Sequence, residues 1–533
     1  MKDTNTKENY ASSVVYRIYP KSFFDSDGDG IGDLAGIESR LPYLSALGVD
    51  TLVLSAITET DSERPEYGCT NYCRINPAIG TDEEFDSLVN AGHTAGFKIF
   101  LSLNLTCTSA QHSWFTQAME SSQNAYKEFY VWRTGKGKNG KHPPNKKRNA
   151  FGQNEWTYSE SKGEWYKNTF GASFPTLNYQ NPRLRKEILD VIRYWLNRNV
   201  DGFVIDDAYF AIKKIILSDL KPIYKPGKDF FSSGGGIFQI LNEIREKIGR
   251  DFPIILYGKN VKPGAFSYLV STDRAVGDSL YAEHLISNLT YDTSFCKEHF
   301  FRSYLSLQRS ICKRDLTFAF EDEAHTRMIS RFSDGADPAM HLEKMLCTLL
   351  LTSTATPSIY QGQEIGMRDF PLRKSVENLI AKDNLHTTSP MQWDNVPSAG
   401  FTSGYPYLPI NDNYNKINVI AQANDADSLL NYTKHMIAFR KDSTALTLGD
   451  FSDHSKGNIL SFIRQSDKEK LLIIANTTDK HMNYKVPSDL LEKEAVCEVS
   501  NYNVVSKQIF PTMGLRPYEV RIFRMKAPYL TIK

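Results

Sequence analysis

Short apolar runs alternate with amphipathic segments along most of the chain. Runs rich in β-branched and other apolar residues occur at 14–19, 51–55, 98–103, 202–206, 253–257, 317–320 and 358–361, with a weaker one near 279–283. Segments with helical periodicity separate these runs, and this alternation is typical of parallel βα units. Eight such units predict a closed (β/α)₈ barrel, in which functional side chains lie at the C-terminal ends of the strands.

Two stretches depart from this alternation. Residues 105–176 lie between the third and fourth predicted strands and are too many for a loop, so they are predicted to form an inserted subdomain. Towards the C-terminus the pattern changes to short strands without intervening helices, which predicts an antiparallel β domain. The predicted fold class is therefore α/β: a TIM barrel from 1–104 and 177–447, the insert, and a C-terminal β domain at 448–533.

Composition narrows the functional class. The 533 residues carry a formal net charge of +1, which gives no electrostatic reason to expect nucleic acid or an anionic membrane as partner. No apolar run approaches the ~18 residues of a membrane helix, and the N-terminus lacks the apolar core of a signal peptide. Seven scattered cysteines favour reduced thiols, so a cytoplasmic location is expected.

A motif for a hard cation follows the first predicted strand. Oxygen ligands stand at alternate positions from Asp25 to Asp33, with a glycine to permit a tight turn. Gly36 stands where an EF-hand loop has its last glutamate, so the motif is not an EF-hand. The alternative is a solvated acidic turn without metal. We predict a structural Ca²⁺, or possible Mg²⁺, with candidate ligands Asp25, Asp27, Asp29, the Ile31 carbonyl and Asp33.

The fourth predicted strand carries a resemblance to a known family. Residues 201–206, Asp-Gly-Phe-Val-Ile-Asp, resemble the strand that bears the nucleophilic aspartate in glycoside hydrolase family 13. Residues 358–367 and 389–401 resemble that family's eighth strand and the loop that walls its substrate entrance. The resemblance runs from about 14 to 526 and is closest to the oligo-1,6-glucosidase and α-glucosidase branch. It implies a (β/α)₈ barrel, an α-glucoside ligand and a structural calcium at the acidic loop.

Most catalytic positions implied by the resemblance hold other residues. Asp206 occupies the nucleophile position, but Lys259 occupies that of the general acid and Ala324 that of a third carboxylate. Val204 replaces an arginine that holds the nucleophile, so Asp206 is expected to lose its charge partner and its pKa to rise. The remaining pocket positions implied by the resemblance are Tyr67, Cys107, Glu323 and Arg327.

Two functional hypotheses follow. The first is an inactive or severely impaired member of the branch, retained to bind a carbohydrate or a protein partner. Heavy chains of heteromeric amino-acid transporters resemble the branch and lack its activity, although they carry a membrane helix. The second is an active α-glucoside hydrolase or transglycosylase with Asp206 as nucleophile and a rebuilt site, in which Glu323, Asp322 or Asp207 supplies a missing carboxylate.

Three cysteines fall on loops after the second and third predicted strands. Cys69, Cys73 and Cys107, with His93 or His112 nearby, offer ligands for zinc or a redox pair. The spacing is a weak signal, and chance replacement by a small residue is favoured over either site.

The insert contains a basic run at 136–148. An acidic partner is one interpretation of this run. A solvated loop is the default interpretation and is favoured.

Overall fold

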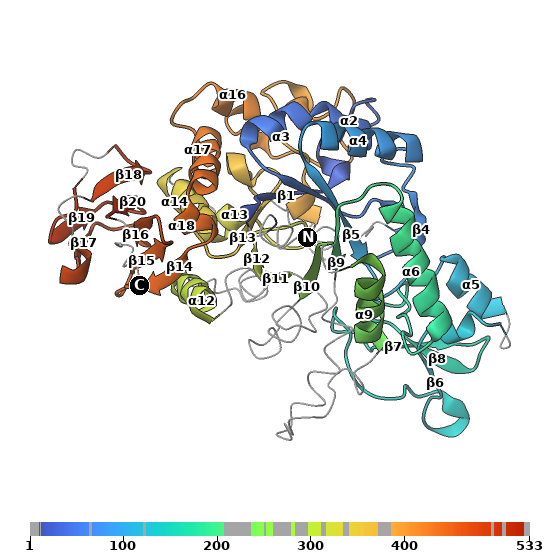
Figure 1. The fold of residues 1–533 in the computed structure, drawn as a ribbon. Helices are drawn as coiled ribbons and strands as arrows, with labels where there is room; N and C mark the ends of the chain where they lie inside the picture. The colour runs from blue at the N-terminus through green and yellow to red at the C-terminus, as the bar shows by residue number, and fades with distance from the viewer. Residues whose placement is uncertain are drawn as a thin grey trace, which may run out of the picture.

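The computed structural model describes residues 10, 12–62, 67–120, 124–206, 236–249, 252–258, 279–282, 297–310, 316–333, 340–370, 385–491, 495–503 and 508–526. Eight parallel strands close into a barrel in the order β1-β13-β12-β11-β10-β9-β5-β2 (Figure 1), which confirms the predicted fold class. The barrel strands are β1 (Val15–Ile18), β2 (Thr51–Leu54), β5 (Lys98–Asn104), β9 (Gly202–Asp206), β10 (Ile254–Gly258), β11 (Ser279–Ala282), β12 (Leu316–Phe318) and β13 (Thr356–Tyr360).

Helices cover the outside of the barrel. They include α2 (Leu34–Ser39), α3 (Leu41–Leu47), α4 (Asp82–Thr94), α6 (Pro182–Leu196), α9 (Gly236–Ile248), α12 (Lys297–Ser310), α13 (Met328–Ser333), α14 (Met340–Leu351), α16 (Val419–Ala423), α17 (Leu429–Asp442) and α18 (Thr444–Thr447). Local sequence sets their starts. In α4, Thr81 and Glu84 form a capping box, and in α6 Asn181 caps a helix that begins at Pro182.

Strand alternation divides the barrel side chains between two cores. Outward-facing residues such as Tyr16 and Leu52 pack beneath the helices. The inward-facing layer is apolar and consists of Tyr10, Val15, Val53, Phe100, Val204, Ile255 and Ala319. Tyr10 covers its N-terminal side, where the hydroxyl lies 2.7 Å from Thr317 Oγ1. Inward-facing side chains further along the strands therefore lie at the C-terminal mouth.

The insert and the C-terminal region form sheets of their own. The insert holds α5 (Ser113–Glu120) and a sheet of β6 (Trp132–Arg133), β8 (Glu164–Lys167) and β7 (Trp156–Ser159). A hairpin after β2 pairs β3 (Thr58–Thr60) with β4 (Cys69–Ile75). The C-terminal antiparallel sheets are β14 (Asp450–Asp453), β15 (Ile459–Gln465), β16 (Lys470–Asn476), β20 (Val520–Met525) and β18 (Val496–Ser500), and β17 (Met482–Lys485) with β19 (Thr512–Leu515).

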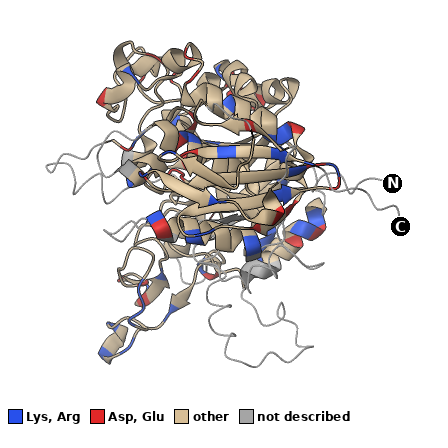
Figure 2. Cartoon of the chain, turned by 90° about the vertical axis from the view of Figure 1, so that its left-hand side faces the viewer, with Lys and Arg blue, Asp and Glu red and all other residues tan. Residues whose placement is uncertain are grey.

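The charged side chains of the folded chain are mixed in sign, as the near-zero net charge of the sequence leads one to expect. In the view of Figure 2, Lys and Arg are interspersed with Asp and Glu over most of the described chain that is visible. The domain boundaries given from the sequence, at 104/105, 176/177 and 447/448, stay predictions.

Candidate functional site

Asp206 lies at the barrel mouth, above the inner apolar layer. On β9, Val204 belongs to that layer and Asp206 follows two residues later on the same face, 16% exposed. Ser102 on β5 pairs in register with Val204, and its hydroxyl donates a hydrogen bond to the Asp206 carboxylate. This carboxylate therefore lies at the C-terminal end of the barrel strands, where (β/α)₈ proteins carry their functional groups.

A guanidinium from another strand partners Asp206. Arg17 on β1 is 4% exposed, and its Nη2 lies 3.5 Å from Asp206 Oδ1. The same side chain donates from Nε and Nη2 to the Glu323 carboxylate, at 2.7 and 2.5 Å. The expectation that Val204 leaves Asp206 without a charge partner is wrong, because β1 supplies the cation that β9 lacks.

The pKa of Asp206 is raised above its ordinary value. Burial is the main cause; Arg17 opposes it, Glu323 adds to the rise, and the Ser102 hydrogen bond lowers the pKa again. The predicted direction of the shift is confirmed, but its physical cause is desolvation rather than the absence of a cation.

Glu323 reaches the mouth from the turn between β12 and α13. Asp322 Oδ1 accepts from the Ala324 main-chain N–H at 2.9 Å and lies 2.6 Å from His325 Nδ1, which ties the turn together. Thr387 Oγ1 donates to the main-chain oxygen of Glu323 at 2.5 Å. Glu323 is thus held at the mouth. The Asp322 side chain instead bonds within the turn, and Ala324 has no carboxylate.

The Asp206 and Glu323 carboxylates are close together. Each contacts Nη2 of Arg17, at 3.5 and 2.5 Å, so their nearest oxygens lie at most about 6 Å apart. Retaining glycosidases hold their two carboxyl groups ~5–5.5 Å apart. Here the guanidinium contacts both, and both oxygens of Glu323 accept from it. Two further positions considered from the sequence, Lys259 and Asp207, lie outside the described residues.

Arg327 is fully buried at the C-terminal end of β13. Its Nη1 donates to Glu321 Oε1 at 3.1 Å and to the Gln361 main-chain oxygen at 3.0 Å. Its guanidinium lies 4.9 Å from the centroid of the Tyr360 ring. Burial raises the pKa of Glu321, and Arg327 opposes that rise. Arg327 therefore joins Glu321 to the residue that follows β13.

An aromatic cluster flanks the mouth at the junction with the insert. Tyr67, Cys107, Phe170 and Phe174 pack together in one buried group. The Tyr67 ring stacks on Phe170 at 4.3 Å, and Phe151 meets Tyr67 edge-on at 6.0 Å. The structure thus joins two residues that the sequence predicted separately, Tyr67 and Cys107, in one buried aromatic cluster.

The cysteines do not form a metal or redox site in the described part of the chain. Cys69, Cys73 and Cys107 form no disulfide among the described residues, and no group of three metal-binding side chains includes any of them there. Burial raises the pKa of Cys69 to about 12 and that of Cys73 to about 11, so both stay protonated and unreactive. Burial also lowers the pKa of His112 to about 4.

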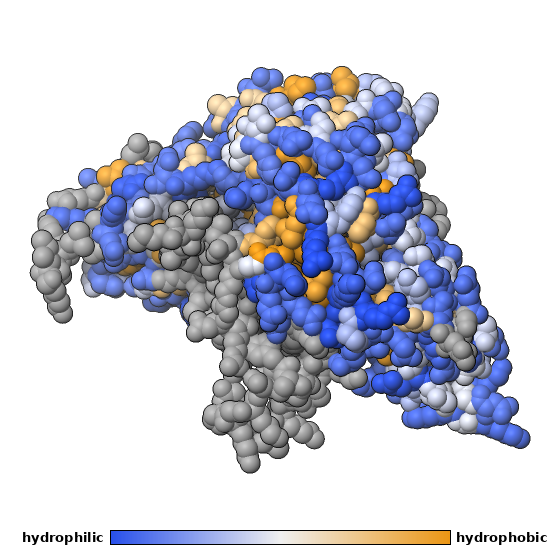
Figure 3. Space-filling model, turned by 45° about the vertical axis from the view of Figure 1, so that its right-hand side comes forward, coloured by the Kyte–Doolittle hydropathy of each residue, from blue (hydrophilic) through white to orange (hydrophobic). Residues whose placement is uncertain are grey.

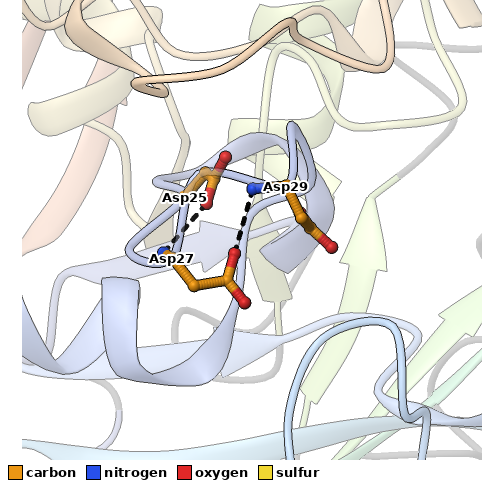
Figure 4. A group of neighbouring side chains, drawn as sticks. All are labelled: Asp25, Asp27 and Asp29. Carbon is orange, nitrogen blue, oxygen red and sulfur yellow. Dashed lines mark hydrogen bonds between the residues drawn. The ribbon is translucent and has the colours of Figure 1, made fainter.

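The acidic loop after β1 gathers three carboxylates. Oxygens of Asp25, Asp27 and Asp29 lie within 4.8 Å of one another (Figure 4). The loop is wound by main-chain N–H groups that donate to these side chains: Asp27 N to Asp25 Oδ1, and Asp29 N to Asp27 Oδ1, both at 3.1 Å. Carboxylate oxygens at this spacing fit a hard divalent cation.

The other two predicted ligands behave differently. Asp33 caps α2, where its side chain accepts from Gly36 N at 2.5 Å and from Ser26 N at 2.7 Å. It is not one of the three gathered carboxylates. Ile31 donates its N–H to Asp29 Oδ1 at 2.7 Å. The metal itself stays a prediction.

Sequence reasoning missed Arg17 as a member of the site. Arg17 and Val15 have the same strand parity, so an inward-facing Arg17 at the mouth was accessible from the pattern. Its second partner was not, because Glu323 lies 306 positions further along the chain.

Residues 17–449 match the catalytic domain of alpha-amylase. The chain belongs to the α-amylase family. It is 31% identical to an oligo-1,6-glucosidase of Bacillus cereus, over 98% of this chain and 100% of that protein. It is 28% identical to a trehalose-6-phosphate hydrolase of Bacillus subtilis, over 97% and 98% of the two chains.

Solved structures of the family agree. An isomaltulose synthase of Erwinia rhapontici superposes with a TM-score of 0.86 at 26% identity, covering 97% of this chain and 98% of that one. A trehalose-6-phosphate hydrolase of Bacillus licheniformis gives a TM-score of 0.86 at 25% identity, covering 97% and 99%. The resemblance to the α-glucosidase branch is thereby confirmed. Across the described residues, no helix combines the length and apolarity that crossing a membrane requires.

Proposed function

We propose that this chain binds an α-glucoside-type carbohydrate at its barrel mouth and does not hydrolyse it at an enzymatic rate. Membership of the α-amylase family supports the carbohydrate binding, and the observation that carries the lack of hydrolysis is the ion pair between Arg17 and Glu323 beside Asp206. A sugar centred between these strand ends would have to share the space with a buried, doubly bonded ion pair. Separating such a pair is costly, because each partner would be left as an uncompensated charge.

The chemistry of the carboxylates supports the same proposal. Hydrolysis with retention needs one carboxylate as nucleophile and one carboxylic acid that protonates the leaving oxygen. Glu323 accepts from Arg17 through both oxygens, so Arg17 occupies both oxygens that a proton donor to the leaving group would use. Proton transfer of this kind typically contributes ~10²–10⁴-fold to the rate.

The second candidate function is an active α-glucoside hydrolase or transglycosylase with a rebuilt site. It is favoured by the contact that Asp206 and Glu323 both make with Arg17 Nη2, which keeps them within reach of the separation that retention needs. Several relatives are also named as hydrolases, among them the oligo-1,6-glucosidase of Bacillus cereus.

One pair of measurements separates the candidates. We expect no turnover of an aryl α-glucoside, maltose or isomaltose above background, and an increase in melting temperature with maltose or isomaltose. Robust hydrolysis that is lost on Asp206→Asn would overturn the proposal and establish the rebuilt enzyme. No turnover together with no stabilisation by any sugar would instead favour a protein-interaction scaffold.

We also propose a structural Ca²⁺ or Mg²⁺ held by Asp25, Asp27 and Asp29. Burial acts to raise the pKa of Asp25, but hydrogen bonds from Thr402 and the loop N–H groups outweigh it and hold the pKa below its ordinary value. An excess of chelator should lower the melting temperature of the wild type, whereas Asp27→Ala should melt at one temperature with and without chelator. A wild type that melts identically in chelator and in excess Ca²⁺ or Mg²⁺ would contradict the metal.

A further inference from the structure

An apolar cavity lies among the helices that cover the barrel. It is bounded by α13, α14, α17, β13 and the turn η4 (Gln363–Ile365), and these helices lie together near β13 in Figure 1. The face shown in Figure 3 is mostly hydrophilic, with apolar residues mainly near its centre and along its top. Most of that face offers a ligand no apolar contact, so an internal apolar space is a better place for a further site.

The cavity is separate from the barrel mouth. Ile359 on β13 lines it and belongs to the core beneath the helices, not to the inner layer of the barrel. Its volume is about 40 Å³. One water needs roughly 10–15 Å³ on the same measure, so there is room for about three groups of that size. Glu343, Cys347 and Gln363 line it and are partly exposed, which marks the side from which a ligand would enter.

Two carboxylates line this apolar space. Glu364 on η4 is 1% exposed; its Oε1 accepts from the hydroxyls of Tyr16 and Tyr43 at 2.8 and 2.6 Å, and its Oε2 has no hydrogen-bond partner in the described chain. Glu343, in the first turn of α14, packs over the same turn, because a Cβ at Gly366 would lie 2.9 Å from its Oε1. Within the described ranges neither carboxylate belongs to an ion pair.

The chemistry of the lining selects the ligand. A buried carboxylate oxygen without a donor is costly, so a ligand with positive charge and N–H groups would be favoured there. A hard metal ion needs several oxygen ligands, but the walls are aliphatic, and no group of three metal-binding side chains in the described chain includes Glu343 or Glu364. An ammonium group with a short apolar tail satisfies both the carboxylates and the walls.

We propose that this cavity binds a short primary alkylammonium ion, with its ammonium group held by Glu343 and Glu364 and its alkyl chain against the aliphatic wall. An ammonium group offers three N–H donors to the two carboxylates. A tail of about two or three carbons fills the remaining room. The site goes beyond the proposed carbohydrate binding and does not depend on it.

The ionisation of Glu343 should control the affinity. Burial raises the pKa of Glu343 to about 8, and Arg368 and Lys344 oppose that rise. The other titratable groups of the lining are Glu364 on η4, Glu321 after β12, which pairs with Arg327, and Cys347 on α14, whose pKa burial raises to about 12. An alkylammonium stays protonated to about pH 10, as lysine does. Its affinity should therefore rise about tenfold or more from pH 6 to pH 8.5, as Glu343 loses its proton.

Calorimetric titration with matched ligands tests the inference. The ligands are propylammonium chloride, the neutral isostere propan-1-ol, and potassium chloride, all at one ionic strength set with sodium chloride. Propylammonium should bind with a stoichiometry of one and at least about tenfold more tightly than either of the others, because only it combines charge, donors and an apolar tail.

Three variants localise the ligand. Glu343→Gln keeps the shape of the side chain and should weaken propylammonium binding at least about tenfold and remove its pH dependence. The matched control is Glu83→Gln, the same change at an exposed position in the first turn of α4, and it should alter the affinity less than about twofold. Cys347→Leu fills the cavity without changing its charge and should also weaken binding at least about tenfold. Melting temperatures check that all three fold.

Each alternative occupant gives its own result. Equally tight binding of propan-1-ol would show a merely apolar space, and equally tight binding of K⁺ would show an inorganic cation site. No binding of propylammonium would leave the cavity to water. Equal losses in the two glutamate variants would reduce the effect to diffuse attraction, and unchanged affinity in Cys347→Leu would place the ligand elsewhere. Any of these results overturns the inference and leaves the proposed carbohydrate binding untouched.

Discussion

The protein buries arginine in two different settings. At the barrel mouth, Arg17 contacts the carboxylates of Asp206 and Glu323. At the junction of the barrel with the C-terminal β domain, Arg440 on α17 and Arg464 on β15 are also fully buried, but they bond to main-chain carbonyls. Neither junction arginine pairs with a carboxylate in the described part of the chain.

The junction contacts surround the end of one helix. Arg440 Nη1 donates to the Leu351 oxygen at 2.8 Å, and Arg464 Nη1 donates to the oxygens of Thr352 and Ser353 at 2.7 and 2.6 Å. These carbonyls lie at and just beyond the C-terminus of α14, where intrahelical donors run out and the helix dipole is negative. Burial still lowers the pKa of Arg440 to about 9 and that of Arg464 to about 10.

The two settings differ in what the cations serve. Main-chain carbonyls do not titrate, and a substitution of the residue that carries one does not remove it. The junction arginines therefore have a structural role, because they join two domains. The mouth is built from three side chains on β1, β9 and the turn after β12, each of which a single substitution changes. A single substitution at the mouth therefore changes the charge of the site directly.

The largest effect should come from the junction. Arg464→Met should lower the free energy of unfolding by about 3–5 kcal/mol, because buried carbonyls left without donors each cost roughly 1–3 kcal/mol. Urea unfolding measures the change. The control is Arg302→Met on α12, where the arginine is exposed and pairs with Glu298, and the expected change is within about 0.5 kcal/mol. Similar losses in the two variants would erase the distinction between the settings.

A smaller and pH-dependent loss is expected at the mouth. Arg17→Met leaves Asp206 and Glu323 side by side without a cation, and should cost about 2–4 kcal/mol at neutral pH. Removal of Arg17 takes away a cause that lowers the pKa of Asp206, so protonation relieves more of the strain as pH falls. Unfolding at pH 5 and pH 8 should show a smaller loss at pH 5. Arg17→Met with Glu323→Met should recover part of the stability; no recovery would contradict the pairing.

The sequence predicted the barrel well and the mouth only in part. The eight strands follow from local periodicity, including the weak one that became β11. The acidic loop is equally local, since Asp25, Asp27 and Asp29 lie within five positions. The cation beside Asp206 was missed because it depends on β1 and β9 meeting across the barrel, and no local pattern encodes a contact between Arg17 and Glu323. Lys259 stays a sequence-based prediction, outside the described residues.

Asp206→Asn should change how the stability of the protein depends on pH, which tests the titration of the buried carboxylate at the mouth. Asp206 has a raised pKa in the folded protein, so it contributes stability below its unfolded value of about 3.9, and this contribution is lost as pH rises through the folded pKa. Asparagine mimics the protonated form and does not titrate. Relative to wild type, the variant should therefore gain stability as the pH rises from about 4 to about 7. A difference that stays constant over this range would show that Asp206 does not titrate differently on folding.

The smallest effect expected is the recovery of catalysis. Lys259→Glu alone should give no turnover of an aryl α-glucoside, because groups that act as a unit are strongly non-additive. Val204→Arg, Lys259→Glu and Ala324→Asp together restore the carboxylates and the arginine implied by the family, yet the Arg17–Glu323 pair still fills the mouth.

Adding Arg17→Met and Glu323→His to that triple variant removes the pair and should give a trace of turnover, since a misplacement of ~1 Å can still cost ~10²-fold. The matched control carries the same five substitutions together with Asp206→Asn, and its turnover should fall to background. Robust turnover by Lys259→Glu alone would show that a missing acid, and not the ion pair at the mouth, is what separates this chain from its hydrolytic relatives.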